Sequence, residues 1–323
     1  MSAPTVLVTG GRGFIGRHLV ARLREEGARV RVSTRAWDLL PDEVEADLSN
    51  SAALDVACAG VESVFHCAGH AHAFSSGREE EVRLHWQVNY EGTKSLAEAA
   101  ARAGVRTFVF LSSVKAMGAP GAHCIAEDWP ILPDSPYGQA KRAAEEVVLA
   151  IGKATGMGVT VLRPALVYGF GGRGNLERMG ALVRRGCFPP LPETGNRRSL
   201  VHVTDLVSVL CRVAGEPLAV GKTYTIAHSH APSGRTLYEG MRVALGYPSV
   251  RWAVPRRVLE VGATLGDLVG KATGRRLPFD RQVLDRLLES ACYSPARIER
   301  ELGWWARVGL EDGLREMFGL ARG

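Results

Sequence analysis

The sequence predicts an α/β protein with a doubly wound parallel sheet and a second, smaller domain. In the amino-terminal half, short β-rich runs alternate with helical patterns, which is typical of βαβ units. The first run leads into a glycine-rich turn over residues 9–16, where a helical pattern begins. At 323 residues the chain exceeds the usual size of one domain. We therefore expect one domain over residues 1–165 and a smaller, mostly carboxy-terminal α/β domain over residues 166–323, with some segments returning to the first.

The apolar spacing places each element in turn. Residues 6–8 form the first predicted strand, and residues 14–26 form a helix that Gly27 ends. The later predicted strands cover residues 30–33, 61–67, 105–111 and 159–162, and the later helices cover residues 81–103 and 137–151. Beyond Pro164 the pattern loosens into loops rich in glycine and proline, which sets the domain boundary there.

Composition argues against several classes of protein. The formal net charge of +6 is modest and the basic doublets lie far apart, so no nucleic-acid partner is expected. No apolar run reaches the ~20 residues of a membrane span. A later stretch could form a membrane-surface helix, but its pattern favours a helix that faces the core of the smaller domain. Its apolar positions are Val258, Leu259, Val261, Leu265 and Leu268. The first strand begins almost at the initiator methionine and leaves no room for a signal peptide, which predicts a cytoplasmic protein.

Cysteine and histidine spacing predicts neither cross-links nor a metal site. The six cysteines are scattered without a C-x-x-C pair, so we expect no disulfide framework and no zinc site, only reduced and mostly packed thiols. His70 and His72 could ligate a metal, but no carboxylate or cysteine cluster at ligand spacing accompanies them. No metal is expected.

The glycine-rich turn has the features of a Rossmann-type dinucleotide site. Gly10, Gly13 and Gly16 allow a tight turn, close approach of a pyrophosphate and close helix packing, with the helix amino terminus facing the anion. The strand before the turn and the amphipathic helix after it supply the context that this fingerprint requires. We therefore predict that residues 1–165 bind NAD(P).

The residues after the second strand bear on the choice of cofactor. A carboxylate about 20 residues after the glycines normally holds the adenosine 2′-hydroxyl of NAD, but here the strand ends in Ser33-Thr34-Arg35. With Arg12 in the turn and Arg35 after the strand, a 2′-phosphate would meet two guanidinium groups and no repelling charge. NADP(H) is therefore preferred. Two exposed arginines beside a site that accepts NAD(H) are the alternative.

Tyr137 and Lys141 are the candidate catalytic pair. Their spacing places both on one face of a helix, with Cβ atoms roughly 5 to 6 Å apart. A free phenol titrates near ~10 and needs a nearby cation to exchange protons near neutral pH. Hydride transfer to a ketone creates an alkoxide, which needs a proton donor and a second hydrogen bond at the same oxygen. Without the other motifs, such a pair would be an ordinary helix-surface contact.

These motifs together resemble the extended short-chain dehydrogenase/reductase superfamily, the group of NAD(P)-dependent sugar-nucleotide epimerases, dehydratases and ketoreductases. The order and spacing of the shared motifs span most of the chain. The motifs are residues 9–16, Asp47-Leu48, His66-Cys67-Ala68-Gly69, Val88-Asn89 with Gly92-Thr93, Leu111-Ser112-Ser113, residues 137–141 and residues 198–205.

The resemblance implies a role for each matching residue. Tyr137 would be the general acid or base, Lys141 would lower its pKa and hold the nicotinamide ribose, and Ser113 would hydrogen-bond the reacting oxygen. Ser113 fits better than Ser112 because it lies five residues before Gly118, as in the family. The cofactor contacts would come from Gly10, Arg12, Gly13, Phe14, Ile15, Gly16, Thr34, Arg35, Asp47, Leu48, Ala68, Gly69, Asn89 and Ala165. The substrate contacts would come from Lys115, Asn175 and Arg198, with Arg198 on the diphosphate.

The resemblance also narrows the reaction. Dehydratases of the family place an Asp-Glu pair soon after the serine, and residues 114–118 lack it, so dehydration is not expected. Residues 112–115 and Gly174-Asn175 are similar to ketoreductases that reduce a UDP-linked 4-keto-6-deoxy sugar, often in bacterial polysaccharide assembly. We therefore expect an oxidoreductase acting at C4 of a nucleoside-diphosphate sugar, first a UDP-4-keto-6-deoxy-sugar 4-reductase. A UDP-sugar 4-epimerase with tightly bound NAD is the alternative, although epimerases often carry asparagine where this chain has Leu166.

One alternative of another class and one expectation about assembly remain. A non-catalytic dinucleotide-sensing protein is a more distant alternative, which the joint presence of the tyrosine, lysine and serine disfavours. The family also implies a homodimer, formed through the helix over residues 81–103 and the helix that begins near Tyr137.

Overall fold

A parallel sheet of seven strands lies at the centre of the protein, in a computed structural model that describes residues 3–36, 38–71, 79–273 and 281–320. The strands are β1 (Thr5–Thr9), β2 (Arg29–Thr34), β3 (Glu43–Glu45), β4 (Ser63–His66), β5 (Thr107–Leu111), β7 (Gly158–Pro164) and β10 (Thr223–Ile226). Their order is β10-β7-β5-β4-β1-β2-β3, and every neighbouring pair is parallel. The strand order reverses between β1 and β4, so the ligand crevice of such a sheet lies at the carboxyl ends of these two strands.

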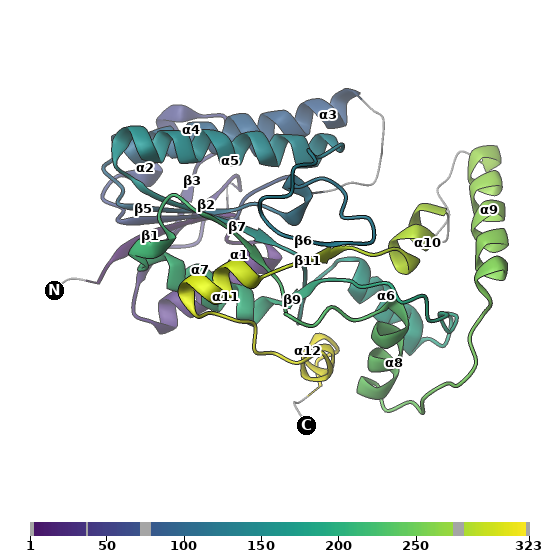
Figure 1. Cartoon of the computed structure of the whole chain (residues 1–323). Helices are drawn as coiled ribbons and strands as arrows, with labels where there is room; N and C mark the ends of the chain where they lie inside the picture. The colour runs from purple at the N-terminus through teal and green to yellow at the C-terminus, as the bar shows by residue number, and fades with distance from the viewer. Residues whose placement is uncertain (1–2, 37, 72–78, 274–280, 321–323) are drawn as a thin grey trace.

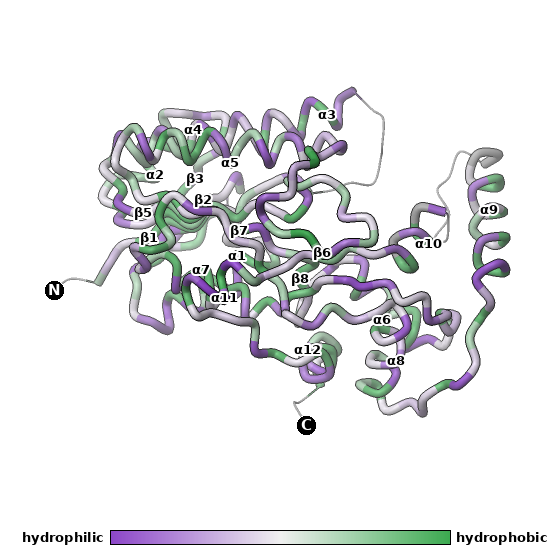
Figure 2. Tube along the Cα trace, viewed as in Figure 1, coloured by the Kyte–Doolittle hydropathy of each residue, from purple (hydrophilic) through white to green (hydrophobic). Residues whose placement is uncertain are grey.

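Helices cover both faces of the sheet and make three layers (Figure 1). On one face lie α2 (Ser51–Cys58), α4 (Gly92–Arg102) and α5 (Pro136–Thr155), and on the other lie α1 (Phe14–Glu25), α7 (Val203–Ala214) and α11 (Ala296–Leu302). The strands are largely hydrophobic, as expected of parallel strands buried on both faces (Figure 2). The predicted α/β class with a doubly wound parallel sheet is confirmed.

The helix predicted over residues 81–103 contains a π-helical segment. It consists of α3 (Glu79–His85), the π-helix η1 (Trp86–Glu91) and α4, in direct succession. A π turn holds one more residue than an α turn, and such turns are frequent at functional sites. Here it carries the fully buried Asn89.

The carboxy-terminal half builds a second hydrophobic core. Around it lie α6 (Asn175–Arg184), α8 (Gly234–Ala244), α9 (Arg256–Thr273), α10 (Arg281–Leu288), α12 (Leu310–Met317) and the paired strands β8 (Leu166–Tyr168) and β9 (Leu200–His202). Short elements complete the chain: the 3₁₀ helices η2 (Val114–Ala116) and η3 (Pro217–Ala219) and the paired strands β6 (Cys124–Ile125) and β11 (Cys292–Tyr293). Although α7 and β10 follow residue 165, they pack on the central sheet. The division into residues 1–165 and 166–323 stays a prediction.

Helix α9 differs from the expectation that its apolar positions face the core. Leu259 is buried, together with Ala263 on the same side of the helix. The positions Val258, Val261, Leu265 and Leu268 are instead between 56% and 61% exposed. The helix therefore packs on the core through the side that carries Leu259 and Ala263, and its other apolar stripe lies in solvent.

The expectation that the cysteines stay reduced is wrong for one pair. Cys124 in β6 and Cys292 in β11 form a disulfide across 168 residues of sequence. Their strands run parallel, with Cys124 opposite Cys292 in the register. Because this pairing arises from tertiary structure, no local cysteine motif announces it. Cys58, Cys67, Cys187 and Cys211 are free.

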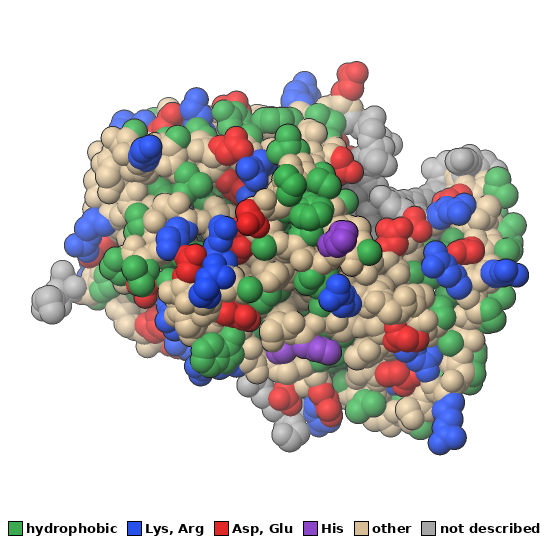
Figure 3. Space-filling model, in the orientation of Figure 1, with side chains coloured by type: hydrophobic (Ala, Val, Ile, Leu, Met, Phe, Trp, Pro, Cys, Tyr) green, Lys and Arg blue, Asp and Glu red, His purple; other side chains and the backbone are tan. Residues whose placement is uncertain are grey.

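Charged side chains of both signs are interspersed on the face shown in Figure 3, without a basic patch. Among the described residues, no helix is long and apolar enough to cross a membrane.

Candidate active site

The glycine turn brings β1, α1 and the end of β4 into close contact. Gly10 has a φ of +70°, and a Cβ there would lie 2.8 Å from the backbone nitrogen of Ala68. A Cβ on Gly16 would collide with the carbonyl oxygen of Gly10, which accepts a hydrogen bond of 2.9 Å from the amide of Gly13. No side chain larger than hydrogen fits at either position.

The amino terminus of α1 suits a pyrophosphate. Gly13 is its N-cap residue and makes no side-chain cap hydrogen bond, so this residue leaves the first amides of the helix uncapped. Phe14 and Ile15 open the helix; Phe14 packs edge-on against the ring of His18, and Ile15 packs against the core. These residues therefore fit the dinucleotide that the turn predicts.

The residues predicted for the adenosine end lie after β2 and β3. Thr34 ends β2, and its hydroxyl accepts a hydrogen bond from the amide of Ala36. Asp47 accepts hydrogen bonds from the amide and hydroxyl of Ser49, which lower the pKa of its carboxyl group, and exposed Arg35 adds to this effect. Leu48 packs against Gly92 of α4, where a Cβ would lie 2.8 Å from the Cβ of Leu48.

The expectation that no acid stands near Arg12 is wrong. The Arg12 guanidinium donates to both carboxylate oxygens of Glu43, at 2.9 and 2.6 Å, and to Asp38 at 3.2 Å. The hydrogen bond from Arg12 lowers the pKa of Glu43 to about 2. Glu43 begins β3, opposite Val32 of β2, so strand pairing brings an acid to Arg12 although none stands directly at the end of β2. A 2′-phosphate at Arg12 would therefore face two carboxylates as well.

Lys141 is buried beside Gly69, one of the residues predicted to line the nicotinamide path. Its Nζ donates to the carbonyl oxygen of Leu111 at 3.0 Å and lies 4.6 Å from the centroid of the Phe110 ring. A Cβ on Gly69 would lie 3.4 Å from this Nζ and 3.0 Å from Oδ1 of Asn89. The structure thus brings Gly69, Asn89 and Lys141 together.

Tyr137 and Ser113 face each other. Burial raises the pKa of Tyr137, and a hydrogen bond with the hydroxyl of Ser113 partly offsets the shift. The sequence predicted a lowered Tyr137 pKa. The difference arises because burial of the phenol outweighs the hydrogen bond with Ser113, while the ammonium of Lys141 donates to the carbonyl oxygen of Leu111.

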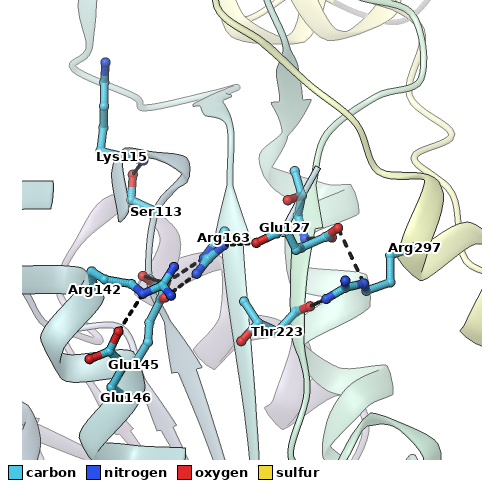
Figure 4. Close-up of polar contacts among 11 residues, drawn as sticks. Ser113, Lys115, Glu127, Arg142, Glu145, Glu146, Arg163, Thr223 and Arg297 are labelled. Atoms are coloured by element: carbon cyan, nitrogen blue, oxygen red, sulfur yellow. Dashed lines mark hydrogen bonds and ion pairs between the residues drawn. The ribbon is translucent and has the colours of Figure 1, made fainter. Parts of the chain in front are cut away.

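The two neighbouring serines have different partners. Ser112 is buried and donates to the carboxylate of Glu145. Ser113 caps η2 by accepting from the amide of Lys115 at 3.2 Å (Figure 4). Only the second serine therefore lies next to the phenol.

The predicted substrate residues occupy separate elements. Lys115 is exposed in η2, and Asn175 is exposed at the first position of α6. Arg198 donates to the carbonyl oxygen of Glu289 at 3.2 Å. Burial raises the pKa of Tyr293 to about 12, and the positive charge of Arg198 acts against this shift. Tyr293 packs in one cluster with Ala165, which directly follows β7.

His85 is a site residue that sequence reasoning missed. Its buried ring lies 5.6 Å from the ring of Tyr137 and 5.0 Å from that of His70. Asn89 holds the His70 backbone with hydrogen bonds of 2.8 and 2.9 Å, and its amide lies 3.4 Å from Nδ1 of His85. The four-residue spacing of His85 and Asn89 was a signal that could have found it.

No cluster of three His, Cys, Asp or Glu side chains that could hold a metal occurs in the described ranges. His72, considered above with His70, lies outside them.

Comparisons with known proteins converge on one family. Residues 6–227 match the NAD dependent epimerase/dehydratase family. A UDP-glucose 4-epimerase from Vibrio cholerae is 29% identical over 323 residues, covering 97% of this chain and 94% of that protein. A 3-beta-hydroxysteroid dehydrogenase from Mycolicibacterium neoaurum is 34% identical over 331 residues, covering 96% of this chain and 89% of that protein.

Solved structures show the same architecture. MoeE5, in complex with UDP-glucose and NAD, superposes with a TM-score of 0.75 at 27% identity over 98% of this chain and 97% of the other. The UDP-glucose 4-epimerase of Thermotoga maritima, with UDP-glucose, gives 0.74 at 25% identity over 98% and 97%.

Proposed function

Since this chain belongs to the NAD-dependent epimerase/dehydratase family of extended short-chain dehydrogenases/reductases and is an NAD-dependent enzyme, we propose that it acts at carbon 4 of a UDP-sugar. The observation that carries the proposal is the hydroxyl pair of Tyr137 and Ser113, in the same site as Lys141 and the glycine turn. We propose a UDP-sugar as the substrate because one relative is a UDP-glucose 4-epimerase and one structural neighbour binds UDP-glucose with NAD.

Each residue has a definite task in this reaction. The bound nicotinamide would supply or accept the hydride. Tyr137 exchanges a proton with the oxygen on carbon 4, and Ser113 holds the same oxygen with a second hydrogen bond. Lys141 provides a buried ammonium near the phenol, and Asn89 fixes the backbone of His70 beside it. Arg198 is the candidate for the diphosphate.

The pairing of Arg12 changes the order of the candidate reactions. The sequence favoured NADP(H) because no acid was visible near the two arginines, and this preference supported the 4-reductase that residues 112–115 and Gly174-Asn175 suggested. Glu43 and Asp38 occupy Arg12, so we place NAD and 4-epimerisation first. The UDP-4-keto-6-deoxy-sugar 4-reductase is second; the exposed Lys115 next to Ser113, as in the ketoreductases, favours it.

A cofactor analysis followed by a substrate panel tests the proposal. Mass spectrometry of the purified protein should find bound NAD, and UDP-glucose should be converted into UDP-galactose without added cofactor. Oxidation of NADPH on addition of a UDP-4-keto-6-deoxy sugar would instead establish the second candidate. Turnover of a 3-hydroxysteroid but of no sugar nucleotide would refute both, and the panel includes it because of the steroid dehydrogenase relative.

Tyr137→Phe separates an enzyme from a dinucleotide sensor. The variant loses the proton donor but keeps the ring, so turnover should fall about 10²- to 10⁴-fold while the dissociation constant for NADH stays the same. Unchanged turnover in this variant would refute the catalytic role of the phenol.

We also propose a cytoplasmic homodimer formed through α3, η1, α4 and α5. Leu84 and Trp86 are each 37% exposed there, and the Trp86 ring packs edge-on against Tyr90. Light scattering after gel filtration should give twice the chain mass, and Trp86→Glu should shift it toward the monomer. A monomeric wild-type protein would rule the dimer out.

A further inference from the structure

We propose that the buried ion pair of Glu145 and Arg163 positions the catalytic residues: Glu145 fixes the strand end that carries Ser113 and supplies the negative charge that faces Lys141. This inference rests on the proposed catalytic roles of Ser113 and Lys141. Glu145 is a positioning residue in this scheme, because it acts through its neighbours.

The pair is buried and its geometry is well formed. Glu145 in α5 is 2% exposed and Arg163 in β7 is 3% exposed. The guanidinium donates through Nε at 2.9 Å and through Nη2 at 2.6 Å, one bond to each carboxylate oxygen (Figure 4). Such a bidentate arrangement fixes the orientation of both side chains.

Glu145 holds the carboxyl end of β5 through Ser112. The Ser112 hydroxyl donates to Oε1 of Glu145, the oxygen that also accepts from Nε of Arg163. The Ser112 amide donates to the carbonyl oxygen of Leu162 at 2.8 Å. Ser113 is the next residue. The position of its hydroxyl is therefore fixed by Ser112, which is held through both its side chain and its backbone amide.

Glu145 also stands one helical turn after Lys141, on the same face of α5. The ammonium lies near the Leu111 carbonyl and the Phe110 ring on β5 and near His66 and Cys67 at the end of β4, and Tyr137 stands one turn before Lys141 on α5. Burial lowers the pKa of His66 to about 3 and raises that of Cys67 to about 12, so both are neutral at pH 7. Among these described groups, Glu145 is the one that carries a negative charge.

This charge opposes the effect of burial. Burial lowers the pKa of Lys141 to about 8, and the carboxylate of Glu145 is the largest influence in the other direction. Without it, the lysine would lose its proton within the neutral pH range. A neutral amine could neither stabilise a phenolate nor hold the ribose by a charge-assisted hydrogen bond.

A purely structural role would not require charges here. Replacing a buried ion pair with apolar side chains of similar volume is often neutral or stabilising. The ion pair is part of a larger polar network, because Arg163 also donates to the carbonyl oxygen of Glu127 at 3.2 Å. The Glu127 carboxylate accepts from the amide of Thr225 at 2.6 Å and lies 3.6 Å from Nε of Arg297 in α11 (Figure 4).

The decisive variant is Glu145→Gln, with Glu146→Gln as its matched control. Glu146 is the adjacent residue of α5, and its exposed side chain pairs with Arg142 at 2.8 Å (Figure 4). Both substitutions remove one negative charge from the same helix. NMR of ¹³C-labelled lysine, with the signal assigned through Lys141→Arg, measures the pKa of the ammonium without any substrate. It should fall by about 1 to 3 units in Glu145→Gln and stay unchanged in Glu146→Gln.

Two more variants keep the test decisive if the amide disturbs folding. Glu145→Asp retains the charge and should keep the Lys141 pKa near the wild-type value. The double variant Glu145→Leu with Arg163→Met replaces the pair by apolar groups and should fold, yet show the lowered pKa. An unchanged Lys141 pKa in the glutamine or the double variant would overturn the inference. Since this readout needs no turnover, failure of the proposed sugar chemistry would be seen separately, in the substrate panel.

Discussion

Arg12 in the glycine turn after β1 and Glu43 in β3 form an ion pair of two hydrogen bonds, at 2.9 and 2.6 Å. This pair predicts how the protein distinguishes its cofactors. Glu43→Ala should release Arg12 for a 2′-phosphate and raise the affinity for NADPH relative to NADH by about 10- to 100-fold, the scale of one charged hydrogen bond.

Fluorescence titrations with both reduced cofactors measure this ratio. Asp42→Ala is the control, because the neighbouring Asp42 pairs with exposed Arg24 and not with Arg12. A ratio equal to that of the control would show that Arg12 does not contact the cofactor.

The pKa of Lys141 predicts opposite trends for activity and stability in alkaline solution. Burial lowers this pKa from 10.5 to about 8, so the folded protein loses the proton before the unfolded chain does. Between these two values the unfolded state binds more protons, and the contribution of Lys141 to the free energy of unfolding rises with pH. Turnover should instead fall above pH 8.

Urea unfolding of the wild type and of Lys141→Met at several pH values measures the stability effect. Between pH 8 and pH 10, the free energy of unfolding of the wild type should rise relative to that of the variant. Parallel curves would mean that the lysine keeps its proton throughout this range.

Two leucines on different sides of α9 should differ sharply in their effect on stability. Leu259 is 5% exposed, so Leu259→Ala should lower the free energy of unfolding by about 2 to 5 kcal/mol. Leu265 is 56% exposed, and Leu265→Ala should change it by less than about 0.5 kcal/mol. Urea denaturation compares them directly. Equal losses would indicate that the exposed stripe is covered in solution.

The disulfide predicts a thiol count and a stability loss. The oxidised protein should show four reactive thiols after unfolding without reductant, and six after reduction. Cys292→Ser should lower the free energy of unfolding by about 2 to 4 kcal/mol. Cys187→Ser, at an exposed free cysteine, is the control and should leave it unchanged. Six thiols without reductant would show that the pair is open, as is usual in a reducing compartment.

The features that could be predicted from the sequence are those with a local signal. One example is the succession of β1, the glycine turn and α1, and another is the four-residue spacing of Tyr137 and Lys141. Both can be recognised in the sequence because the residues involved are close together along the chain. Strand bounds differ by one or two residues, since the hydrogen bonds to neighbouring strands decide where a strand ends.

Other features depend on residues that only folding brings together. β3 is three residues long and has no periodic pattern, so the sequence did not predict this strand or the contact of Glu43 with Arg12. The pairs Glu145 with Arg163 and Cys124 with Cys292 likewise join separate elements. The direction of the Tyr137 pKa depends on burial, which a sequence does not state.

The position of β10 has a consequence for synthesis. β7 lies next to the edge of the sheet and is covered there by β10, whose residues 223–226 leave the ribosome some sixty residues after those of β7. Until they emerge, the nascent chain presents an unpaired row of amide and carbonyl groups, the template on which chains aggregate. A fragment cut at residue 165 would keep that open edge permanently, so shortened versions of this protein should end beyond β10.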